Sequence, residues 1–396
     1  MSMSPTIYLK PGKEKSLQRF HPWIFSGALA TDIGNLPEGC IVEVYSSAKQ
    51  YLATGYVQHD SIAVKVLSFE KTAIDRSFWK NKLSSAIDYR KKIGFFDNKN
   101  TNVFRLVNGE GDFLPGLVID WYDGVAVVQC HSQGMLMQKD ILCETLLENL
   151  KGKVKSIYNK SDATLPKRMV AGFQDGFLYG KEDETCLVVE NGNTYQINLR
   201  ESQKTGFFID QRENRKLLQE VSNGKSVLNA FGYTGGFSVS ALRGGAQFVR
   251  TLDISKKAIE GCNENIKRNF DDKAPHQALA VDVLDYLTKM NETYDIIILD
   301  PPAFAKHQKD LKQGLKAYRN INQKALEKIN HGGFLFTFSC SQAVNKQEFT
   351  TLLFSTSVIA RRNIRIVNTL PHAQDHPVNI FHPEGEYLKG LLLYVE

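Results

Sequence analysis

Apolar and polar positions in the second half of the chain alternate between two patterns. Short apolar runs typical of buried strands are separated by segments in which apolar residues recur at helical spacing. Strands that alternate with helices predict right-handed crossovers and a parallel, doubly wound α/β sheet from about residue 196 onward. The runs that predict its strands are KSVLNAF (225–231), FVRTLDIS (248–255), ALAVDV (278–283), YDIIILD (294–300) and FLFTFSCS (334–341).

The first half of the chain shows a different pattern. Three runs (40–46, 51–57 and 62–69) are separated by turn residues, which predicts a small β-barrel or sandwich. A helix follows at 75–96, and a hairpin is expected at 116–130 with its turn at Asp123-Gly124. The predicted domains are therefore an N-terminal β domain (1–72), a small α+β domain (73–195) and the α/β domain (196–396).

Length and composition limit the class of protein. A chain of 396 residues is too long for one compact core, and 42% hydrophobic with 23% charged residues is typical of a soluble globular protein. No run approaches the roughly 18 apolar residues that span a bilayer. The N-terminus has no apolar core of the secretory type. The sequence predicts a cytoplasmic protein without a membrane partner.

The six cysteines are scattered, with no C-x-x-C pair and no histidine cluster beside them, so we expect no metal site. Single cysteines in such a protein are usually small buried residues, which is the interpretation for Cys40, Cys130, Cys143, Cys186 and Cys262. Cys340 is different because it stands between two serines at the end of a predicted strand. It is either a space filler or a nucleophile, and a nucleophilic thiol needs a nearby cation, base or helix N-terminus.

Polar residues and glycines gather at the ends of the predicted parallel strands, where such sheets bind ligands. The loop NAFGYTGG (229–236) lets a ligand approach the backbone closely, although it lacks the G-x-G-x-x-G spacing of dinucleotide sites. Asp253 suits the hydroxyls of a ribose, and Asp282 suits the amino group of an adenine. Each of these carboxylates has the alternative role of a helix N-cap.

The strand that ends at Asp300 is followed by Pro301 and Pro302. Two prolines fix the backbone and remove two donors, so this turn is expected to be rigid, with free carbonyl groups. Such a turn suits the edge of a planar base, and the alternative is a simple stop signal for a helix. The next strand delivers Cys340 to the same edge of the sheet.

Positive charge exceeds negative charge by 6, with 49 Lys and Arg against 43 Asp and Glu. The excess alone is weak evidence for a polyanionic partner. It concentrates in LKPGKEKSLQR (9–19) and in AKHQKDLKQGLKAYR (305–319), which directly follows the DPP turn. The second stretch is a candidate for contacts with a polyanionic partner, or otherwise an ordinary solvated helix face. Its candidate residues are Lys306, Lys309, Lys312, Lys316 and Arg319.

Five stretches together resemble the bacterial 23S ribosomal RNA (cytosine-5) methyltransferase family, along nearly the whole chain. They are QKTGFFIDQR (203–212), VLNAFGYTGGFSVSAL (227–242), LDPPAF (299–304), FTFSCS (336–341) and HPEGEYLKG (382–390). The start of the chain, GKEKSLQRFHPWIFSGA (12–28), is similar to PUA RNA-binding domains. The resemblance implies a Rossmann-like class I methyltransferase domain after a small α+β domain and a β-barrel PUA domain.

The resemblance also implies S-adenosylmethionine as cofactor, 23S ribosomal RNA as partner, and roles for particular residues. Cys340 matches the family's nucleophile, which adds to C6 of cytosine, and Asp300 matches the group that holds the base. The base that removes the C5 proton is not identified. The cofactor-binding positions carried over are Lys204, Asp210, Gln211, Asn229, Phe231, Gly232, Asp253, Ile254, Asp282, Val283, Asp300 and Pro301.

Two other functions are compatible with parts of the sequence. An exocyclic-amino methyltransferase also uses a DPP-type turn, but normally places an aromatic residue directly after it, where this chain has Ala303 and then Phe304. A ribosome-assembly factor that retains cofactor binding is the second alternative. The oligomeric state stays open, with a homodimer among the options.

Overall fold

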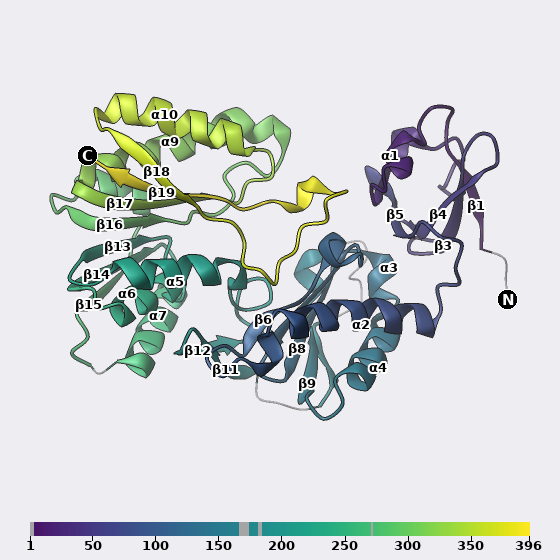
Figure 1. Cartoon of the computed structure of the whole chain (residues 1–396), viewed down its shortest axis with the longest axis horizontal. Helices are drawn as coiled ribbons and strands as arrows, with labels where there is room; N and C mark the ends of the chain where they lie inside the picture. The colour runs from purple at the N-terminus through teal and green to yellow at the C-terminus, as the bar shows by residue number, and fades with distance from the viewer. Residues whose placement is uncertain (1–3, 166–173, 181–183, 271) are drawn as a thin grey trace. The chain divides into compact units, whose positions relative to one another are not determined.

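The structure is a computed structural model that describes residues 4–165, 174–180, 184–270 and 272–396 (Figure 1). The chain forms two compact units. The first comprises residues 1–188, 197–209 and 374–385, and the second comprises 189–196, 210–373 and 386–396. The chain therefore enters each unit more than once. The predicted division into three successive domains, with boundaries after residues 72 and 195, stays a prediction.

The N-terminal part of the first unit is a five-stranded sheet in the order β1-β3-β4-β5-β2. The side chains of β3 alternate between buried and half-buried, as expected for a strand with one face on a core. Its three longer strands are those predicted from the sequence. The elements are β1 (Thr6–Tyr8), α1 (Lys15–Gln18), β2 (Trp23–Phe25), β3 (Ile41–Tyr45), β4 (Tyr51–Val57) and β5 (Ile62–Ser68).

A second five-stranded sheet of this unit has the order β10-β9-β8-β7-β6. The predicted hairpin is confirmed: β7 and β8 pair antiparallel, and Asp123 (φ 48°) and Gly124 (φ 96°) form the left-handed turn between them. The long helix α2 packs with α4 over the core of this sheet. The elements are α2 (Arg76–Lys92), β6 (Val103–Asn108), β7 (Leu117–Tyr122), β8 (Val125–Cys130), α3 (Gln133–Leu136), α4 (Lys139–Asn149), β9 (Ser156–Asn159) and β10 (Gly176–Tyr179). The hairpin β11 (Thr185–Glu190) and β12 (Asn193–Asn198) follows.

The second unit is built on a seven-stranded sheet in the order β15-β14-β13-β16-β17-β19-β18. Its strands are β13 (Ser226–Ala230), β14 (Phe248–Asp253), β15 (His276–Ala280), β16 (Tyr294–Leu299), β17 (Ile329–Ser339), β18 (Ile364–Thr369) and β19 (Lys389–Val395). The first five are parallel, as predicted. The last strand, β19, runs antiparallel to both of its neighbours. The sheet is therefore mixed rather than wholly parallel.

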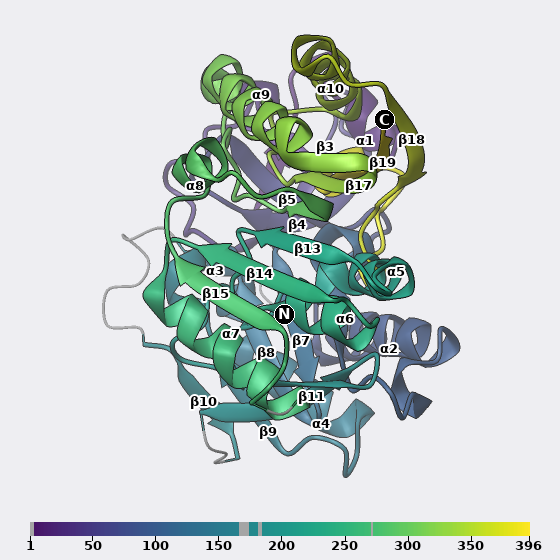
Figure 2. The same cartoon turned by 90° about the vertical axis from the view of Figure 1, so that its left-hand side faces the viewer.

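Helices cover both faces of this sheet (Figure 2). α8, α9 and α10 contribute to one continuous apolar core with β13, β16 and β17, and α6 and α7 lie on the other face. The helices are α5 (Arg212–Val221), α6 (Gly236–Arg243), α7 (Lys256–Asn269), α8 (Val283–Lys289), α9 (Leu311–Lys328) and α10 (Lys346–Ala360). Each helix in the described part of the chain is too short or too polar to cross a membrane.

A buried ion pair joins α5 to the end of β11 within the second unit. The guanidinium of Arg215 donates to both oxygens of Glu190 at 2.6 and 2.7 Å, and the two side chains are only 3% and 1% exposed. Removing one member of such a pair leaves the other charge buried and uncompensated.

We therefore expect Glu190→Gln to lower the free energy of unfolding by about 3 kcal/mol, measured by urea denaturation. Glu220→Gln is the control, because Glu220 is an exposed carboxylate on the same helix as Arg215 and forms no ion pair among the described residues. This substitution should lower the free energy of unfolding by less than about 1 kcal/mol. Equal effects of the two substitutions would contradict a stabilising role for the buried pair.

Candidate active site

Three parallel strands deliver their last residues to one edge of the second unit's sheet. The register pairs Ala230 of β13 with Leu299 of β16, and Leu299 with Thr337 of β17. The next residues along these strands therefore emerge near one another, at the point where the strand order reverses. Cys340 confirms the convergence, because its Sγ donates a hydrogen bond to the carbonyl oxygen of Pro301 at 3.7 Å.

The serines that flank Cys340 hold the loops around it. The Oγ of Ser341 accepts from the backbone N–H of Ala305 at 3.0 Å and is hydrogen-bonded to the hydroxyl of Tyr318 at 2.9 Å. The Oγ of Ser339 accepts from the N–H of Ser341. The DPP turn is thus tied to the end of β17 from two sides. The expectation that its carbonyl groups are free is wrong for Pro301, whose carbonyl accepts from the thiol.

A lysine that the sequence did not single out reaches the same place from β19. The Nζ of Lys389 donates to the carbonyl oxygens of Ser341 and Tyr387, each at 2.6 Å, and the residue is 8% exposed. Burial lowers the pKa of Lys389 to about 8, while the neighbouring Cys340 and Glu386 oppose this shift. Lys389 lies within the HPEGEYLKG stretch, but only the antiparallel pairing of β19 with β17 shows what it faces.

The other cysteines are less suited to chemistry. Cys130, Cys186 and Cys262 are buried, as predicted, and burial raises the pKa of both Cys130 and Cys262 to about 12. Cys40 and Cys143 are only partly buried, which differs from the prediction. Burial raises the pKa of these two thiols as well. A high pKa keeps a thiol protonated and unreactive at neutral pH.

The glycine-rich loop after β13 is held in a tight, left-handed path. Phe231 and Tyr233 have φ values of 61° and 47°. A Cβ atom on Gly232 would overlap the side chain of Thr251, so only glycine allows this close approach of the backbone. Asn229 is fully buried; its Nδ2 donates to Ser238 at 2.8 Å, while its Oδ1 has no hydrogen-bond partner among the described residues.

Asp253 closes β14 and organises the loop opposite. One carboxylate oxygen accepts from the N–H of Tyr233 and the other from the N–H of Ser255, both at 2.9 Å. A carboxylate has about four acceptor positions, so two remain for hydroxyl groups of a ligand. The next residue, Ile254, is 74% exposed, which is unusual for a large apolar side chain and suits a planar ring packed on it.

At the end of β15, Asp282 acts as the N-cap of α8, where its Oδ1 accepts from the N–H of Asp285 at 2.9 Å. The alternative role predicted for this carboxylate, as a helix N-cap, is therefore confirmed. Its second oxygen remains for an adenine amino group, so that role stays a prediction. Val283 is 3% exposed and belongs to the core beneath.

The strip that precedes α5 is engaged in internal contacts. The carboxylate of Asp210, which is 7% exposed, accepts from the hydroxyl of Tyr387 at 2.6 Å. Gln211 is 2% exposed and accepts from Asn214 at 2.6 Å. Lys204 belongs to the first unit, where its exposed ammonium lies 4.9 Å from the centroid of the Phe208 ring. Cofactor contacts by these residues stay predictions.

The basic residues after the DPP turn are all exposed. Lys312, Lys316 and Arg319 lie on α9 at positions i, i+4 and i+7, which places them on one helical face. None of the five predicted residues forms an ion pair within the part of the chain that the structure describes. Their charges are thus available to an anionic partner.

The edge formed by β13, β14, β15 and β16 fits S-adenosylmethionine. It combines a loop without room for a Cβ atom, a buried amide oxygen with no donor among the described residues, a carboxylate with spare acceptor positions and an exposed apolar residue. These features belong to Gly232, Asn229, Asp253 and Ile254. When bound, this cofactor supplies an electrophilic methyl group.

The same conclusion follows from comparison with known proteins. A family model described as S-adenosylmethionine-dependent methyltransferase matches residues 104–377, and a PUA-like domain model matches residues 7–69. The fold and site thus define an S-adenosylmethionine-dependent methyltransferase. Two relatives carry the name ribosomal RNA large subunit methyltransferase I. The chain is 36% identical to the Alteromonas mediterranea protein, and the match covers 99% of both chains. It is 35% identical to the Pseudoalteromonas translucida protein, and that match covers 99% of this chain and 100% of the relative.

The chain belongs to the ribosomal RNA large subunit methyltransferase I family. Among solved structures it is similar to a protein of Streptococcus mutans assigned as a SAM-dependent methyltransferase, with a TM-score of 0.85 and 26% identity over 98% of this chain and 100% of that one. A second similar structure, of a protein assigned as a methyltransferase and complexed with SAH, has a TM-score of 0.86 with the same identity and coverage. The predicted family, fold class and cofactor are confirmed.

We expect Asp253→Asn to weaken binding of S-adenosylhomocysteine about tenfold to a hundredfold, because a hydrogen bond to a charged group contributes about 1.5–3 kcal/mol. Isothermal titration calorimetry measures the change. Asp285→Asn is the matched control, since Asp285 is an exposed carboxylate on the neighbouring helix α8. Unchanged affinity in Asp253→Asn would show that this carboxylate only organises the loop.

Proposed function

We propose that the protein methylates C5 of a cytosine in 23S ribosomal RNA through a covalent adduct between Cys340 and C6 of the base. The observation that carries the proposal is the contact between the thiol of Cys340 and the DPP turn, at the ends of two adjacent parallel strands. The names of the two relatives supply the large-subunit RNA. The choice of C5 of cytosine rests on the chemistry of the site.

A cysteine is required because C5 of cytosine is a poor nucleophile. Addition of the Cys340 thiolate to C6 pushes electron density onto C5, which then takes the methyl group. A base must remove the C5 proton, after which the C5–C6 double bond reforms and the thiolate leaves. The protein thus forms one carbon–sulfur bond and breaks it again in each turnover.

Asp300 and the DPP turn suit recognition of the base. Asp300 directly follows β16 and is partly exposed, at the edge to which β17 brings Cys340. Its carboxyl group can hydrogen-bond N3 and N4 of cytosine and stabilise the charge that develops on addition of the thiolate. The target base must leave its stack to reach such a site, so a single-stranded or loosened segment of RNA is the expected substrate.

The first test compares wild type with Cys340→Ala on unmethylated 23S RNA and labelled S-adenosylmethionine. The wild type should form 5-methylcytosine, and Cys340→Ala should lose at least about a thousandfold in rate because the adduct cannot form. Nucleoside mass spectrometry identifies the product. Cys143→Ala, which alters a partly buried cysteine of the first unit, is the control and should keep full activity.

Two other results would replace the proposal. Full activity of Cys340→Ala with an N-methylated base would establish an exocyclic-amino methyltransferase. Binding of the cofactor without turnover on any RNA would establish a ribosome-assembly factor. Phe304, the first aromatic residue after the DPP turn, is already engaged within the protein. Its ring centroid lies 6.4 Å from that of Phe231 and 4.8 Å from that of Tyr318.

The exposed cations of α9 suit RNA phosphates, and their removal should act on RNA alone. We expect the double substitution Lys312→Glu and Lys316→Glu to raise the Michaelis constant for RNA and to reduce the salt dependence of binding by about 0.7–0.9 per lost phosphate contact. Affinity for S-adenosylhomocysteine should not change. Lys324→Gln is the control, because Lys324 lies on the same helix but pairs with Glu327 at 2.8 Å. A parallel loss of cofactor binding would mean that α9 has been disrupted.

A further inference from the structure

We infer that Lys389 is the positioning residue that holds Cys340 in its reactive, thiolate form. This inference rests on the proposed function, in which Cys340 is the nucleophile. An ordinary thiol has a pKa of about 8.5, so that only a few per cent is ionised at neutral pH. A nearby positive charge is one of the few ways in which a protein raises that fraction.

The pairing of β17 with β19 determines where the charge lies. Because the two strands are antiparallel, β19 begins where β17 ends, and Lys389 pairs directly with Ser339. Cys340 is the next residue after this pair. The ammonium of Lys389 then donates to the carbonyl of Ser341, on the far side of the cysteine. Lys389, on the neighbouring strand β19, therefore contacts the residues on both sides of Cys340: it pairs with Ser339 through the backbone and donates to the carbonyl of Ser341 through its side chain.

The position of the ammonium is fixed by hydrogen bonds. Two of its three N–H groups donate to the carbonyl oxygens of Ser341 and Tyr387, and little of the residue contacts solvent. Neither acceptor carries a full negative charge, so these bonds orient the cation without neutralising it. With a pKa of about 8, Lys389 is protonated about ten to one at pH 7.

Other ionisable groups also face this cluster. Tyr318 reaches Cys340 from α9, and burial raises the pKa of its hydroxyl, so it is neutral near pH 7. Glu386 favours the charged form of Lys389. Asp300 lies at the end of the adjacent strand β16 and opposes ionisation of the thiol. Lys389 supplies the positive charge that offsets this carboxylate.

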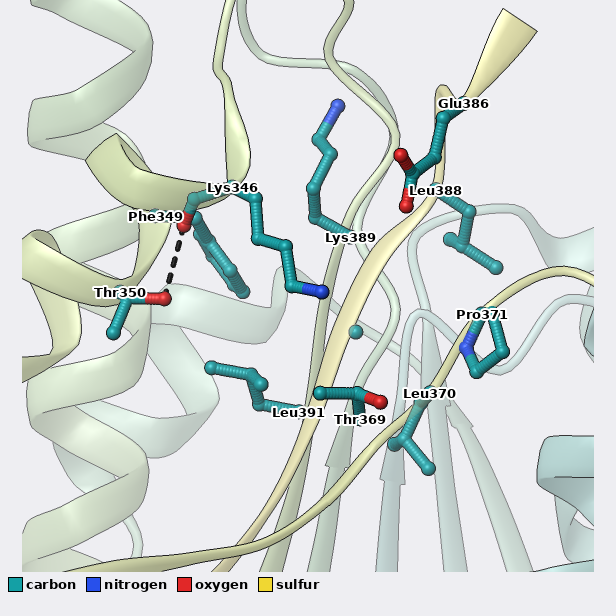
Figure 3. Close-up of a pocket in the computed structure, with 11 residues that line it drawn as sticks. Lys346, Phe349, Thr350, Thr369, Leu370, Pro371, Glu386, Leu388, Lys389 and Leu391 are labelled. Carbon is teal, nitrogen blue, oxygen red and sulfur yellow. Dashed lines mark hydrogen bonds between the residues drawn. The ribbon is translucent and has the colours of Figure 1, made fainter. Parts of the chain in front are cut away.

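A second lysine provides a matched comparison. Lys346 and Lys389 line the same pocket, with Lys346 coming from α10 and Lys389 from β19 (Figure 3). Their ammonium groups point in different directions in the figure. Lys346 is exposed. Its removal changes the charge of the pocket without removing the hydrogen bonds around Cys340.

The test measures the pH dependence of alkylation of Cys340 by iodoacetamide, followed on its own peptide by mass spectrometry. The rate reports the fraction of thiolate, and no RNA is needed. In the wild-type protein the midpoint should lie at least one unit below the ordinary value of about 8.5. A wild-type midpoint at 8.5 or above overturns the inference without any variant.

Lys389→Met should move the midpoint upward by about one to three units, because a nearby opposite charge shifts a pKa by that amount and Lys389 interacts electrostatically with Cys340. Lys389→Arg retains the charge and should keep the midpoint near the wild-type value. Lys346→Met should leave it unchanged. An unchanged midpoint in Lys389→Met, or an equal rise in Lys389→Arg, overturns the inference.

Binding of S-adenosylhomocysteine shows whether each variant is folded, and if Lys389→Met does not fold, the wild-type profile decides. The methylation assay with Cys340→Ala is a separate measurement. A low midpoint that depends on Lys389, together with full methylation by Cys340→Ala, would refute the proposed function alone. A requirement for Cys340 with an ordinary midpoint would refute only the role of Lys389.

Discussion

The parallel pairing of β13, β16 and β17 is the constraint on which the site depends. Parallel strands in register end at the same edge, and hydrogen bonding fixes the offset between them. The glycine loop, the DPP turn and the cysteine come from separate segments of the chain. The loop and Cys340 are more than a hundred residues apart in the sequence. A shift of one residue in β17 would turn Cys340 towards the other face of the sheet. The apolar core between the sheet and α8 to α10 makes such a shift costly.

Backbone carbonyl groups, rather than side chains alone, connect the parts of the site. The thiol of Cys340 donates to Pro301, and Lys389 donates to Ser341 and to Tyr387. The hydroxyl of Tyr387 in turn donates to Asp210, in the strip that precedes α5. A chain of hydrogen bonds thus runs from Ser341, the residue after Cys340, through Lys389 and Tyr387 to the segment that the family resemblance assigns to cofactor binding.

Local pattern was sufficient for most of the architecture. The five parallel strands, the Asp123-Gly124 turn and the glycine loop follow from periodicity and from the backbone freedom of glycine. The sequence could not distinguish an N-cap role of Asp282 from a ligand-binding role, because both need a carboxylate at the same place. Lys389 could not be found this way. A lysine at the start of an apolar strand has no distinguishing local signal, and its partner is 48 residues away in the sequence. The interleaved units are also invisible to local pattern, because they depend on where residues 374–385 return.

The position of β19 has a consequence for how the sheet closes. It comes last along the sequence, yet it lies between β17 and β18 rather than at an edge. Among the described residues β18 pairs with no strand other than β19, so it can join the sheet only when β19 is in place on β17. The same strand carries Lys389 to the end of β17, next to Cys340. Closure of the sheet and placement of this lysine therefore depend on the same strand pairing.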